Sequence, residues 1–153
     1  MNQVKELVVS AIENGTVIDH IPAGKVFDVI KILKLDESDH QLFFGTNLDS
    51  KKYGHKDIIK VCDKYFESAE INKIALVAPT ATLIVIKDFQ VVEKVAVSIP
   101  DTIVGIVKCA NPKCITNHQK ATTRFSVINK DEDLKLVCHY CEKITKKELI
   151  EFV

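Results

Sequence analysis

Apolar residues recur along the first hundred positions with two periods, one typical of strands and one typical of helices. Residues 16–21, Thr-Val-Ile-Asp-His-Ile, are β-branched and apolar apart from one polar pair, and they end at Pro22 as a strand would. Residues 25–35 place Val, Phe, Ile and Leu at helical spacing, with lysines on the other side. The predicted elements are, in chain order, a strand at 16–21, a helix at 25–35, strands at 41–45 and 56–62, a helix at 68–78, and strands at 80–86 and 89–97.

Polar residues separate these segments and predict where the chain turns. Residues 36–39 and 47–53 are rich in Asp, Ser and Lys and are predicted as loops. Ser68 is predicted to cap the second helix, because its hydroxyl can accept hydrogen bonds from the free amides of a first helical turn, and Pro79 ends that helix. A turn at residues 87–88 joins the last two strands into a hairpin.

The predicted element order is β-α-β-β-α-β with one additional strand, which is the order of a ferredoxin-like fold. Residues 98–100, Ser-Ile-Pro, form a natural boundary. We therefore expect an α+β protein, with a ferredoxin-like domain over residues 1–100 and a small all-β domain over residues 101–153. Because ferredoxin-like domains host many unrelated functions, the function has to be argued from particular residues.

Four of the five cysteines lie in the second domain at a spacing typical of a metal site. Cys109-x4-Cys114 and, after twenty-three intervening residues, Cys138-x2-Cys141 can each fold two thiolates onto one side of an ion. Four thiolates leave no open coordination position. A zinc ion bound there would therefore hold the fold together and perform no chemistry.

Two disulfides and a thioredoxin-like redox pair are the alternatives for these cysteines. A redox Cys-x-x-Cys normally opens a helix, whereas Cys138 follows the strand-like run 134–137, and the second pair would have no role. A disulfide framework is typical of secreted proteins, and the chain begins Met-Asn-Gln-Val-Lys without an apolar signal segment, so we expect a cytoplasmic location. The fifth thiol, Cys62, is expected to be a small buried hydrophobe.

Length, composition and charge limit the classes of function. At 153 residues and 46% hydrophobic, the chain can form one small core plus a metal-stapled module of about 50 residues, too small to fold without such a staple. Lys plus Arg equals Asp plus Glu at 21 each, and Arg124 is the only arginine, which disfavours a nucleic-acid reader. No apolar run approaches the length of a membrane span, so we expect no membrane association.

The sequence contains no familiar catalytic motif. It lacks the Gly-x4-Gly-Lys-Ser/Thr phosphate loop, Gly-x-Ser-x-Gly and His-Glu-x-x-His. Asp19-His20 is the one candidate acid–base pair, but adjacent strand residues are expected to point to opposite faces, which suits a proton relay poorly. A stand-alone enzyme is therefore disfavoured, and a zinc-ribbon nucleic-acid-binding protein is the main alternative function.

Five polar residues of the first domain have two interpretations. Lys56 and Lys60 lie four apart on one strand face and could form a solvated edge that discourages aggregation, while His20 could be a satisfied, half-buried histidine. Alternatively, Lys56, Lys60 and Lys94 could neutralise a polyphosphate beside Asp19 and His20, without a glycine loop. Spacing alone leaves both interpretations open.

Several strings of the sequence resemble one known family. The string 14–22, Asn-Gly-Thr-Val-Ile-Asp-His-Ile-Pro, the string 54–60, Gly-His-Lys-Asp-Ile-Ile-Lys, the string 78–81, Ala-Pro-Thr-Ala, and the four-cysteine spacing are similar to the regulatory chain of aspartate carbamoyltransferase. The resemblance spans essentially the whole chain. It implies a non-catalytic subunit with a nucleotide-binding allosteric domain over 1–100 and a zinc-binding domain over 101–153 that contacts the catalytic chain.

The resemblance also implies ligands and partners. CTP and ATP, with UTP as a further candidate, would bind allosterically and tune the first committed step of pyrimidine biosynthesis. Regulatory chains would pair as homodimers and bridge catalytic trimers, giving six catalytic and six regulatory chains with one structural Zn2+ per regulatory chain. Neither nucleic acid nor a membrane is an expected partner.

By position, the resemblance assigns residues to three sites. The nucleotide contacts would be Val9, Ala11, Ile12, Val17, Asp19, His20, Lys56, Lys60, Ile86, Val91 and Lys94. The zinc ligands would be Cys109, Cys114, Cys138 and Cys141, and the contacts with the catalytic chain would be Asn111 and Lys143. The sequence departs from the family pattern at Ser10, Ile84, Phe89 and Lys113, which bears on effector preference and on part of the subunit interface.

Overall fold

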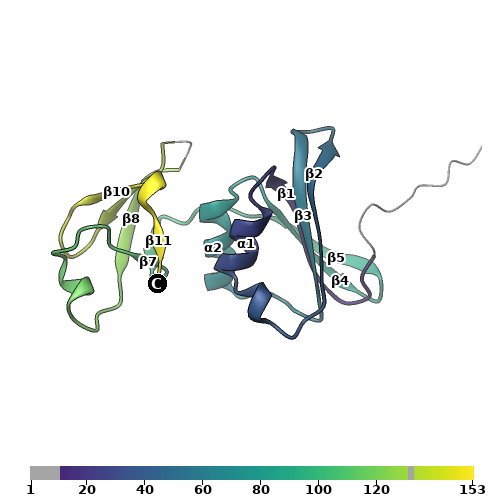
Figure 1. The fold of residues 1–153 in the computed structure, drawn as a ribbon, viewed down its shortest axis with the longest axis horizontal. Coiled ribbons are helices and arrows are strands. Elements are labelled where there is room, and N and C mark those ends of the chain that lie inside the picture. The colour runs from purple at the N-terminus through teal and green to yellow at the C-terminus, as the bar shows by residue number, and fades with distance from the viewer. Residues whose placement is uncertain (1–10, 131–132) are drawn as a thin grey trace, which may run out of the picture. The chain divides into compact units, whose positions relative to one another are not determined.

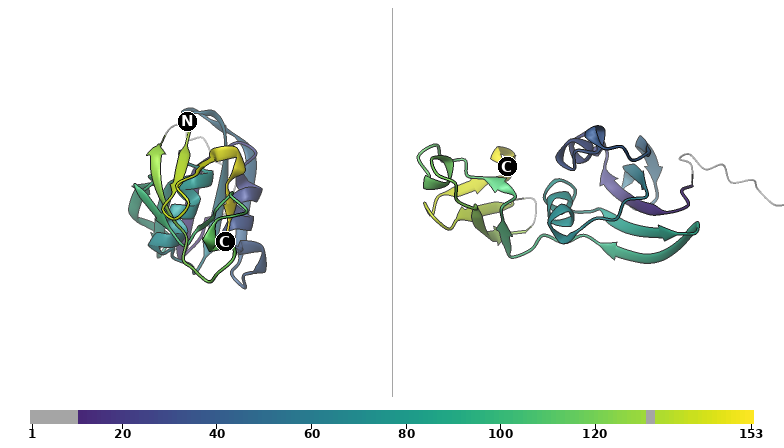
Figure 2. Two further views of the ribbon diagram at one scale, coloured as in Figure 1. Left: turned by 90° about the vertical axis from the view of Figure 1, so that its left-hand side faces the viewer. Right: turned by 90° about the horizontal axis from the view of Figure 1, so that it is seen from below.

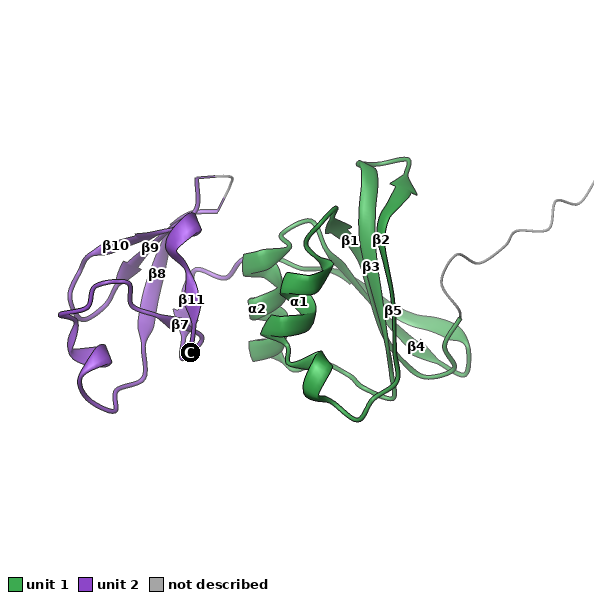
Figure 3. Cartoon of the chain, viewed as in Figure 1, with its two compact units in different colours: residues 1–98 green, residues 99–153 purple. Residues whose placement is uncertain are grey.

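The computed structural model describes residues 11–130 and 133–153 and divides the chain into two compact units, residues 1–98 and residues 99–153 (Figure 3). The first unit contains one sheet, the second contains two, and each unit has its own buried side chains. None of the described helices is long and apolar enough to cross a bilayer.

The first unit is a five-stranded antiparallel sheet with two helices on one face (Figures 1 and 2). The strand order β2-β3-β1-β4-β5 contains the β4-β1-β3-β2 arrangement of a ferredoxin-like fold, with β5 added beyond β4. The predicted fold class is confirmed. The elements are β1 (Gly15–Pro22), α1 (Val26–Ile32), β2 (Leu42–Ser50), β3 (Gly54–Cys62), α2 (Ser68–Val77), β4 (Thr82–Lys87) and β5 (Gln90–Ala96).

Alternation along the strands separates the two faces of this sheet. Ile18 pairs with Ile59 and with Leu83, and these side chains are buried with Ile74 of α2 in the core beneath the helices. Val17, one residue along β1, belongs instead to a smaller apolar cluster on the other face. That second face carries no helix among the described residues and is called the open face below.

Local backbone geometry moves several predicted boundaries. Residues 47–50, predicted as a loop, continue β2 because a bulge between Gly45 and Leu48 lets the strand stay paired with β3. The first helix ends at Ile32 rather than at residue 35, since Lys34 has a left-handed φ of 54° and a 3-10 turn (Leu35–Glu37) follows. These predictions were wrong because side-chain periodicity gives no information about bulges or about residues with left-handed φ.

Two further predictions were wrong by one residue. The helix α2 is capped by Glu67, not Ser68: the Glu67 side chain accepts from the third helical amide, and the Glu70 carboxylate accepts from the Glu67 amide at 3.2 Å. The turn between β4 and β5 is formed by Asp88 and Phe89, both with left-handed φ, rather than by residues 87–88.

The regular elements of the second unit, within residues 99–130 and 133–153, are strands and 3-10 turns. Its core contains Ile103, Val107, Phe125 and Leu136, all fully buried. One sheet has the order β10-β9-β8-β6 and a two-stranded sheet pairs β11 with β7. The elements are β6 (Thr102–Val104), β7 (Val107–Lys108), a 3-10 turn (Ile115–Asn117), β8 (Arg124–Asn129), β9 (Lys135–Cys138), β10 (Ile144–Lys146), a 3-10 turn (Lys147–Leu149) and β11 (Glu151–Phe152).

Candidate functional site

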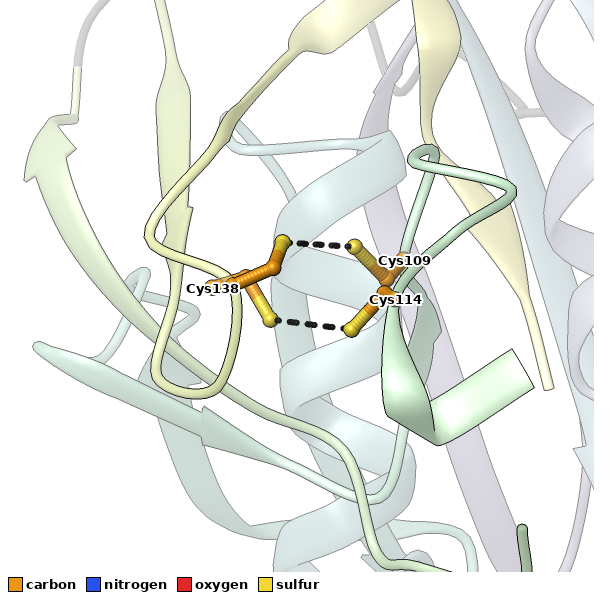
Figure 4. A group of neighbouring side chains, drawn as sticks. Cys109, Cys114 and Cys138 are labelled. Atoms are coloured by element: carbon orange, nitrogen blue, oxygen red, sulfur yellow. Dashed lines mark hydrogen bonds between the residues drawn. The ribbon is translucent and has the colours of Figure 1, made fainter. Parts of the chain in front are cut away.

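The four cysteines predicted as metal ligands lie together in the second unit. The Sγ atoms of Cys109 and Cys141 are 3.7 Å apart, as are those of Cys114 and Cys138 (Figure 4), and all four lie within 4.8 Å of one another. A tetrahedral zinc ion with Zn–S distances of about 2.3 Å would separate its sulfurs by about 3.8 Å. The cysteines are all free, so the disulfide alternative is not supported, and the donor set fits a closed zinc site.

Two short loops bring these thiols together. Cys109 follows β7 and Cys114 precedes a 3-10 turn, and the side-chain amide of Asn117 in that turn donates to the carbonyls of Cys109 (3.0 Å) and Asn111 (2.8 Å). Cys138 ends β9, and its N–H donates to the carbonyl of Lys143 at 3.0 Å, which closes the second loop. Backbone and side-chain hydrogen bonds therefore hold both loops in place around the sulfurs.

Proton affinity differs between the sulfurs. Burial raises the pKa of Cys109 to about 12 and also raises the pKa of Cys138. Burial acts in the same direction on Cys141, but the Lys143 N–H and other donors stabilise its thiolate and lower its pKa to about 7. Because metals bind thiolates, loading this cluster must release protons from the buried cysteines.

The open face of the first unit carries a row of side chains across four strands. Lys60 on β3 pairs with Val17 on β1, Val17 pairs with Ile84 on β4, and Ile84 pairs with Lys94 on β5. Cross-strand partners point to the same face. Lys60 and Lys94, both predicted nucleotide contacts, thus lie on either side of an apolar floor formed by Val17 and Ile84. Three strand spacings, or about 14 Å, separate the backbones of the two lysines.

A bulge in β1 brings Asp19 and His20 to this face together. The two residues oppose only Ile58, and His20 has a left-handed φ of 57°. The Asp19 carboxylate accepts from the His20 N–H at 2.7 Å, and the His20 ring lies 3.2 Å from the hydroxyl of Thr82, the β4 partner of Asp19. The expectation that their side chains point to opposite faces was therefore wrong.

The Asp19 carboxylate forms an ion pair with Lys56 and interacts electrostatically with Lys60. The Lys56 ammonium lies 2.8 Å from Asp19, and both side chains are about four-fifths buried. Burial raises the pKa of Asp19, but the hydrogen bond from Lys56 and neighbouring groups outweigh it and leave the pKa below the ordinary value. Burial lowers the pKa of Lys60, and the charge of Asp19 opposes that shift.

The apolar residues assigned to the nucleotide site are only partly gathered. Ile12, Val17 and Ile86 form one buried cluster on the open face. Val91 pairs with Ile86, but its side chain is 60% exposed, and Ala11 is exposed. Val9 lies outside the described residues.

Three residues near this site were not predicted as nucleotide contacts. Thr82 contacts the His20 ring, Thr80 donates its hydroxyl to the His20 carbonyl at 2.7 Å, and the Tyr53 ring packs edge-on to His20 at 5.7 Å. Thr80 and Thr82 precede or begin a strand, and Tyr53 lies in a turn, so local pattern does not distinguish them from ordinary surface residues. Strand pairing places Thr82 opposite Asp19, and only the folded chain brings Thr80 and Tyr53 into contact with His20.

The two residues assigned to a partner interface lie in the cysteine loops. Asn111 lies between Cys109 and Cys114, and its side-chain oxygen accepts from the Lys113 N–H at 3.1 Å. Lys143 follows Cys141 and is exposed. Both positions are therefore held close to the metal-ligand cluster.

Comparison with known proteins identifies both units with the same family. The model of the aspartate carbamoyltransferase regulatory chain, allosteric domain, matches residues 7–98, and the model of the same chain's metal binding domain matches residues 101–151. The aspartate carbamoyltransferase regulatory chain of Pyrococcus abyssi is 54% identical over 147 residues, covering 95% of this chain and 96% of the relative. That of Phocaeicola vulgatus is 51% identical over 147 residues, covering 96% and 94%.

Proposed function

Because this chain belongs to the family of aspartate carbamoyltransferase regulatory chains, we propose that it binds nucleoside triphosphates on the open face of its first unit and transmits their binding to catalytic chains through its second. A regulatory chain is non-catalytic, so its part in the reaction is to change the activity of its partner. The main observation in support of a nucleotide site is the row formed across the sheet by Lys60, Val17, Ile84 and Lys94.

The charges of the open face suit a triphosphate. A nucleoside triphosphate brings about four negative charges, and ammonium groups form strong, charge-assisted hydrogen bonds with phosphate oxygens. Lys60 and Lys94 stand on either side of an apolar floor, and their flexible four-carbon stems let both ammonium groups reach one phosphate chain. Lys56 adds a third positive charge, which Asp19 balances at 2.8 Å.

The base and ribose would lie over the apolar cluster next to this row. Ile12, Val17 and Ile86 supply a surface for a planar base, and the Asp19 carboxylate and His20 ring supply polar groups for sugar hydroxyls. We propose CTP and ATP as the competing effectors, with UTP as a further candidate. Discrimination between the bases would come from backbone groups near residues 11–12 and 86–91.

The second unit would bind one structural zinc ion and the catalytic chain. The sulfur spacing supports zinc. All four coordination positions would be filled by protein ligands, namely Cys109, Cys114, Cys138 and Cys141. Loops fixed by a metal present polar groups such as Asn111 and Lys143 to a partner at low entropic cost. We propose a cytoplasmic assembly of six catalytic and six regulatory chains, in which regulatory chains pair through their allosteric domains. The family match disfavours the zinc-ribbon nucleic-acid-binding alternative.

Nucleotide binding by a double lysine variant tests this proposal. Lys60→Ala combined with Lys94→Ala removes both charges that flank the apolar floor, and each lost charge-assisted contact is worth about 1.5–3 kcal/mol. We expect affinity for CTP and ATP to fall on the order of 100-fold or more, measured by isothermal titration calorimetry on the assembled complex.

A matched control removes the same charge elsewhere. Lys31→Ala combined with Lys34→Ala changes two exposed lysines in and after α1, on the helix side of the sheet, and should leave both affinities unchanged. Undiminished binding by the Lys60 and Lys94 variant would show that nucleotides do not bind on the open face.

A further inference from the structure

One carboxylate of the first unit is fully buried on the helix side of the sheet. Asp57 lies on β3 between Lys56 and Ile58 and has an exposed fraction of 0%. Its Oδ2 accepts from the N–H groups of Gly24 (2.8 Å) and Val26 (3.0 Å). Burying a carboxylate is costly unless every oxygen is hydrogen-bonded, so these contacts and those of Oδ1 are the reason that Asp57 is tolerated there.

The other oxygen of Asp57 binds the bulge in β2. Its Oδ1 accepts from the N–H of Asn47 (2.7 Å) and from the hydroxyl of Thr46 (3.0 Å). Asn47 has a left-handed φ of 55°, an uncommon conformation that the hydrogen bond holds in place. Asp57 therefore joins three segments: its own strand, the bulge of β2 and the beginning of α1.

The beginning of α1 depends on this contact. Its first residue is preceded by Lys25, which makes no side-chain capping hydrogen bond. The Asp57 carboxylate satisfies the Val26 N–H instead, and its negative charge lies where the dipole of a helix favours one. A residue 31 positions away in sequence thus performs the role of a local cap.

The strand that carries Asp57, β3, lies between β1 and β2, and both neighbours have a bulge next to Asp57. On one side, Thr46 and Asn47 of β2 lie opposite Asp57, and on the other, Asp19 and His20 of β1 lie opposite Ile58. Asp57 points to the helix side, so its neighbour Lys56 points to the open face, where its ammonium meets Asp19 at 2.8 Å. Because Lys56 and Asp57 are adjacent on β3, any displacement of Asp57 also displaces the backbone of Lys56.

We infer that Asp57 is a positioning residue of the nucleotide site: its four hydrogen bonds fix the level of β3 between the two bulges and thereby aim Lys56 at Asp19 and at a bound nucleotide. This inference rests on the proposed function. Groups that bind a ligand are effective only when supporting hydrogen bonds hold them within a fraction of an ångström, and Asp57 is the support for Lys56. Asp57 itself is fully buried on the helix side of the sheet, away from the open face.

The test is a double-mutant cycle on the regulatory chain assembled with its catalytic chains, with CTP as the probe. Asp57→Asn keeps the shape of the side chain but replaces one acceptor by a donor that faces backbone N–H or hydroxyl donors. We expect CTP affinity to fall on the order of tenfold in the otherwise unchanged chain. In a Lys56→Ala background, the same substitution should cost less than about twofold, because the residue through which it acts is gone.

A control variant separates positioning from general loss of stability. Ile59→Val alters the next inward-facing residue of β3, which is fully buried, and lowers stability without touching the contacts of Asp57. We expect it to leave CTP affinity unchanged. Should Asp57→Asn fail to assemble, Thr46→Val removes one of the four hydrogen bonds at an exposed position, and a two- to threefold loss of CTP affinity that disappears with Lys56→Ala is then expected.

The outcomes distinguish this inference from the proposed function. If the unaltered assembly does not bind CTP, the proposed nucleotide function itself is overturned. If the unaltered assembly binds CTP but Asp57→Asn binds equally well, or loses the same factor with and without Lys56, then Asp57 contributes only to stability and the positioning role is overturned. A loss confined to the chain that retains Lys56 supports it.

Discussion

At the scale of single residues, the candidate nucleotide site depends on the balance between Asp19 and its neighbouring lysines. Lys56, Lys60 and Lys94 lie on the open face, and Lys56 is paired with Asp19 at 2.8 Å. The three ammonium groups and the Asp19 carboxylate together therefore carry a net charge of about +2 rather than +3 at the candidate site. This arrangement keeps the largely buried Lys56 compensated when no anion is bound.

The pairing of Asp19 predicts how stability depends on pH. Lys56 and neighbouring hydrogen bonds hold the pKa of Asp19 below its ordinary value of 3.8, against the effect of burial. A carboxylate with a lowered pKa in the folded state contributes stability above its unfolded pKa and loses that contribution as pH falls through the folded value. Asp19→Asn should therefore be less stable than the original chain at pH 7, and the difference should shrink below about pH 4.

Urea unfolding of the full chain at pH 7 and pH 3 measures this difference. Comparing the two chains at each pH cancels the contribution of the metal site, which both share. Asp36→Asn, at an exposed position in a 3-10 turn, is the control and should show no such change. A stability difference for Asp19→Asn that is equal at both pH values would contradict the assigned role of the Asp19 and Lys56 pair.

At the scale of elements, close strand approach and left-handed residues decide where strands begin, bend and turn. The bulges of β1 and β2 and the Asp88–Phe89 turn all contain residues with left-handed φ. The sequence predicts such residues reliably only where Gly or Asn-Gly appears, and His20, Phe89 and Lys34 are none of these. This is why the β2 and hairpin boundaries were missed.

The beginning of β1 gives a sharp test of close approach. Gly15 has a φ of 140°, and a Cβ atom there would lie 2.0 Å from the Val61 carbonyl oxygen in β3. Gly15→Ala must therefore push β1 away from β3, and we expect a loss of more than about 3 kcal/mol in unfolding free energy, measured by urea titration.

Gly24→Ala is the matched comparison for this test. Gly24 also has a left-handed φ, 89°, but a Cβ atom added there would have no atom within 4 Å beyond its chain neighbours. Gly24→Ala should therefore lower the unfolding free energy only by the backbone strain of a left-handed alanine, about 1–2 kcal/mol. Equal losses for the two variants would show that the contact with Val61 does not limit the packing of β1 on β3.

At the scale of the whole molecule, the two units differ in what stabilises them. The first unit buries a core between its sheet and two helices, including Ile18, Ile59 and Ile74. The second has a small core around Phe125 and Leu136 and no α-helix within its described residues, and such small domains commonly need a metal or disulfides to fold. The four-cysteine cluster can hold the metal ion that stabilises this unit.

Removal of the metal should therefore affect the two units differently. Binding of structural zinc and folding of its domain are coupled, with apparent binding energies of about 10–16 kcal/mol in isolated zinc modules. We expect a strong chelator to raise amide hydrogen exchange throughout residues 99–153, to leave exchange in β1, β3 and β4 unchanged, and to release catalytic chains from the assembly. Exchange mass spectrometry and size-exclusion chromatography measure the two effects.

A thiol variant separates the cluster from the remaining cysteine. Cys62→Ser changes the one thiol outside the cluster and should behave like the original chain in both measurements. A chelated sample that stays fully assembled, or whose second unit keeps its protection, would contradict the coupling of metal, fold and partner.

Features that depend on local spacing could be predicted from the amino-acid sequence. The fold class follows from apolar periodicity, because each helix and strand must bury one face. The four-cysteine cluster follows from two short loops, because loops of two or four residues fold their thiols onto one side of an ion whatever surrounds them. The family follows from strings such as residues 14–22, and the comparisons confirm it.

Which distant residues meet depends on long-range packing and could not be predicted from local patterns. Strand order and register depend on burial over the whole sheet, so no local pattern places Lys60 and Lys94, 34 positions apart, in one row, or brings Asp19 and His20 to one face through a bulge. The role of Asp57 was equally hidden, since its partners lie 10 to 33 positions away and supply mainly backbone N–H groups, which have no sequence signature. Side-chain identity determined the available chemistry, and long-range packing determined its geometry.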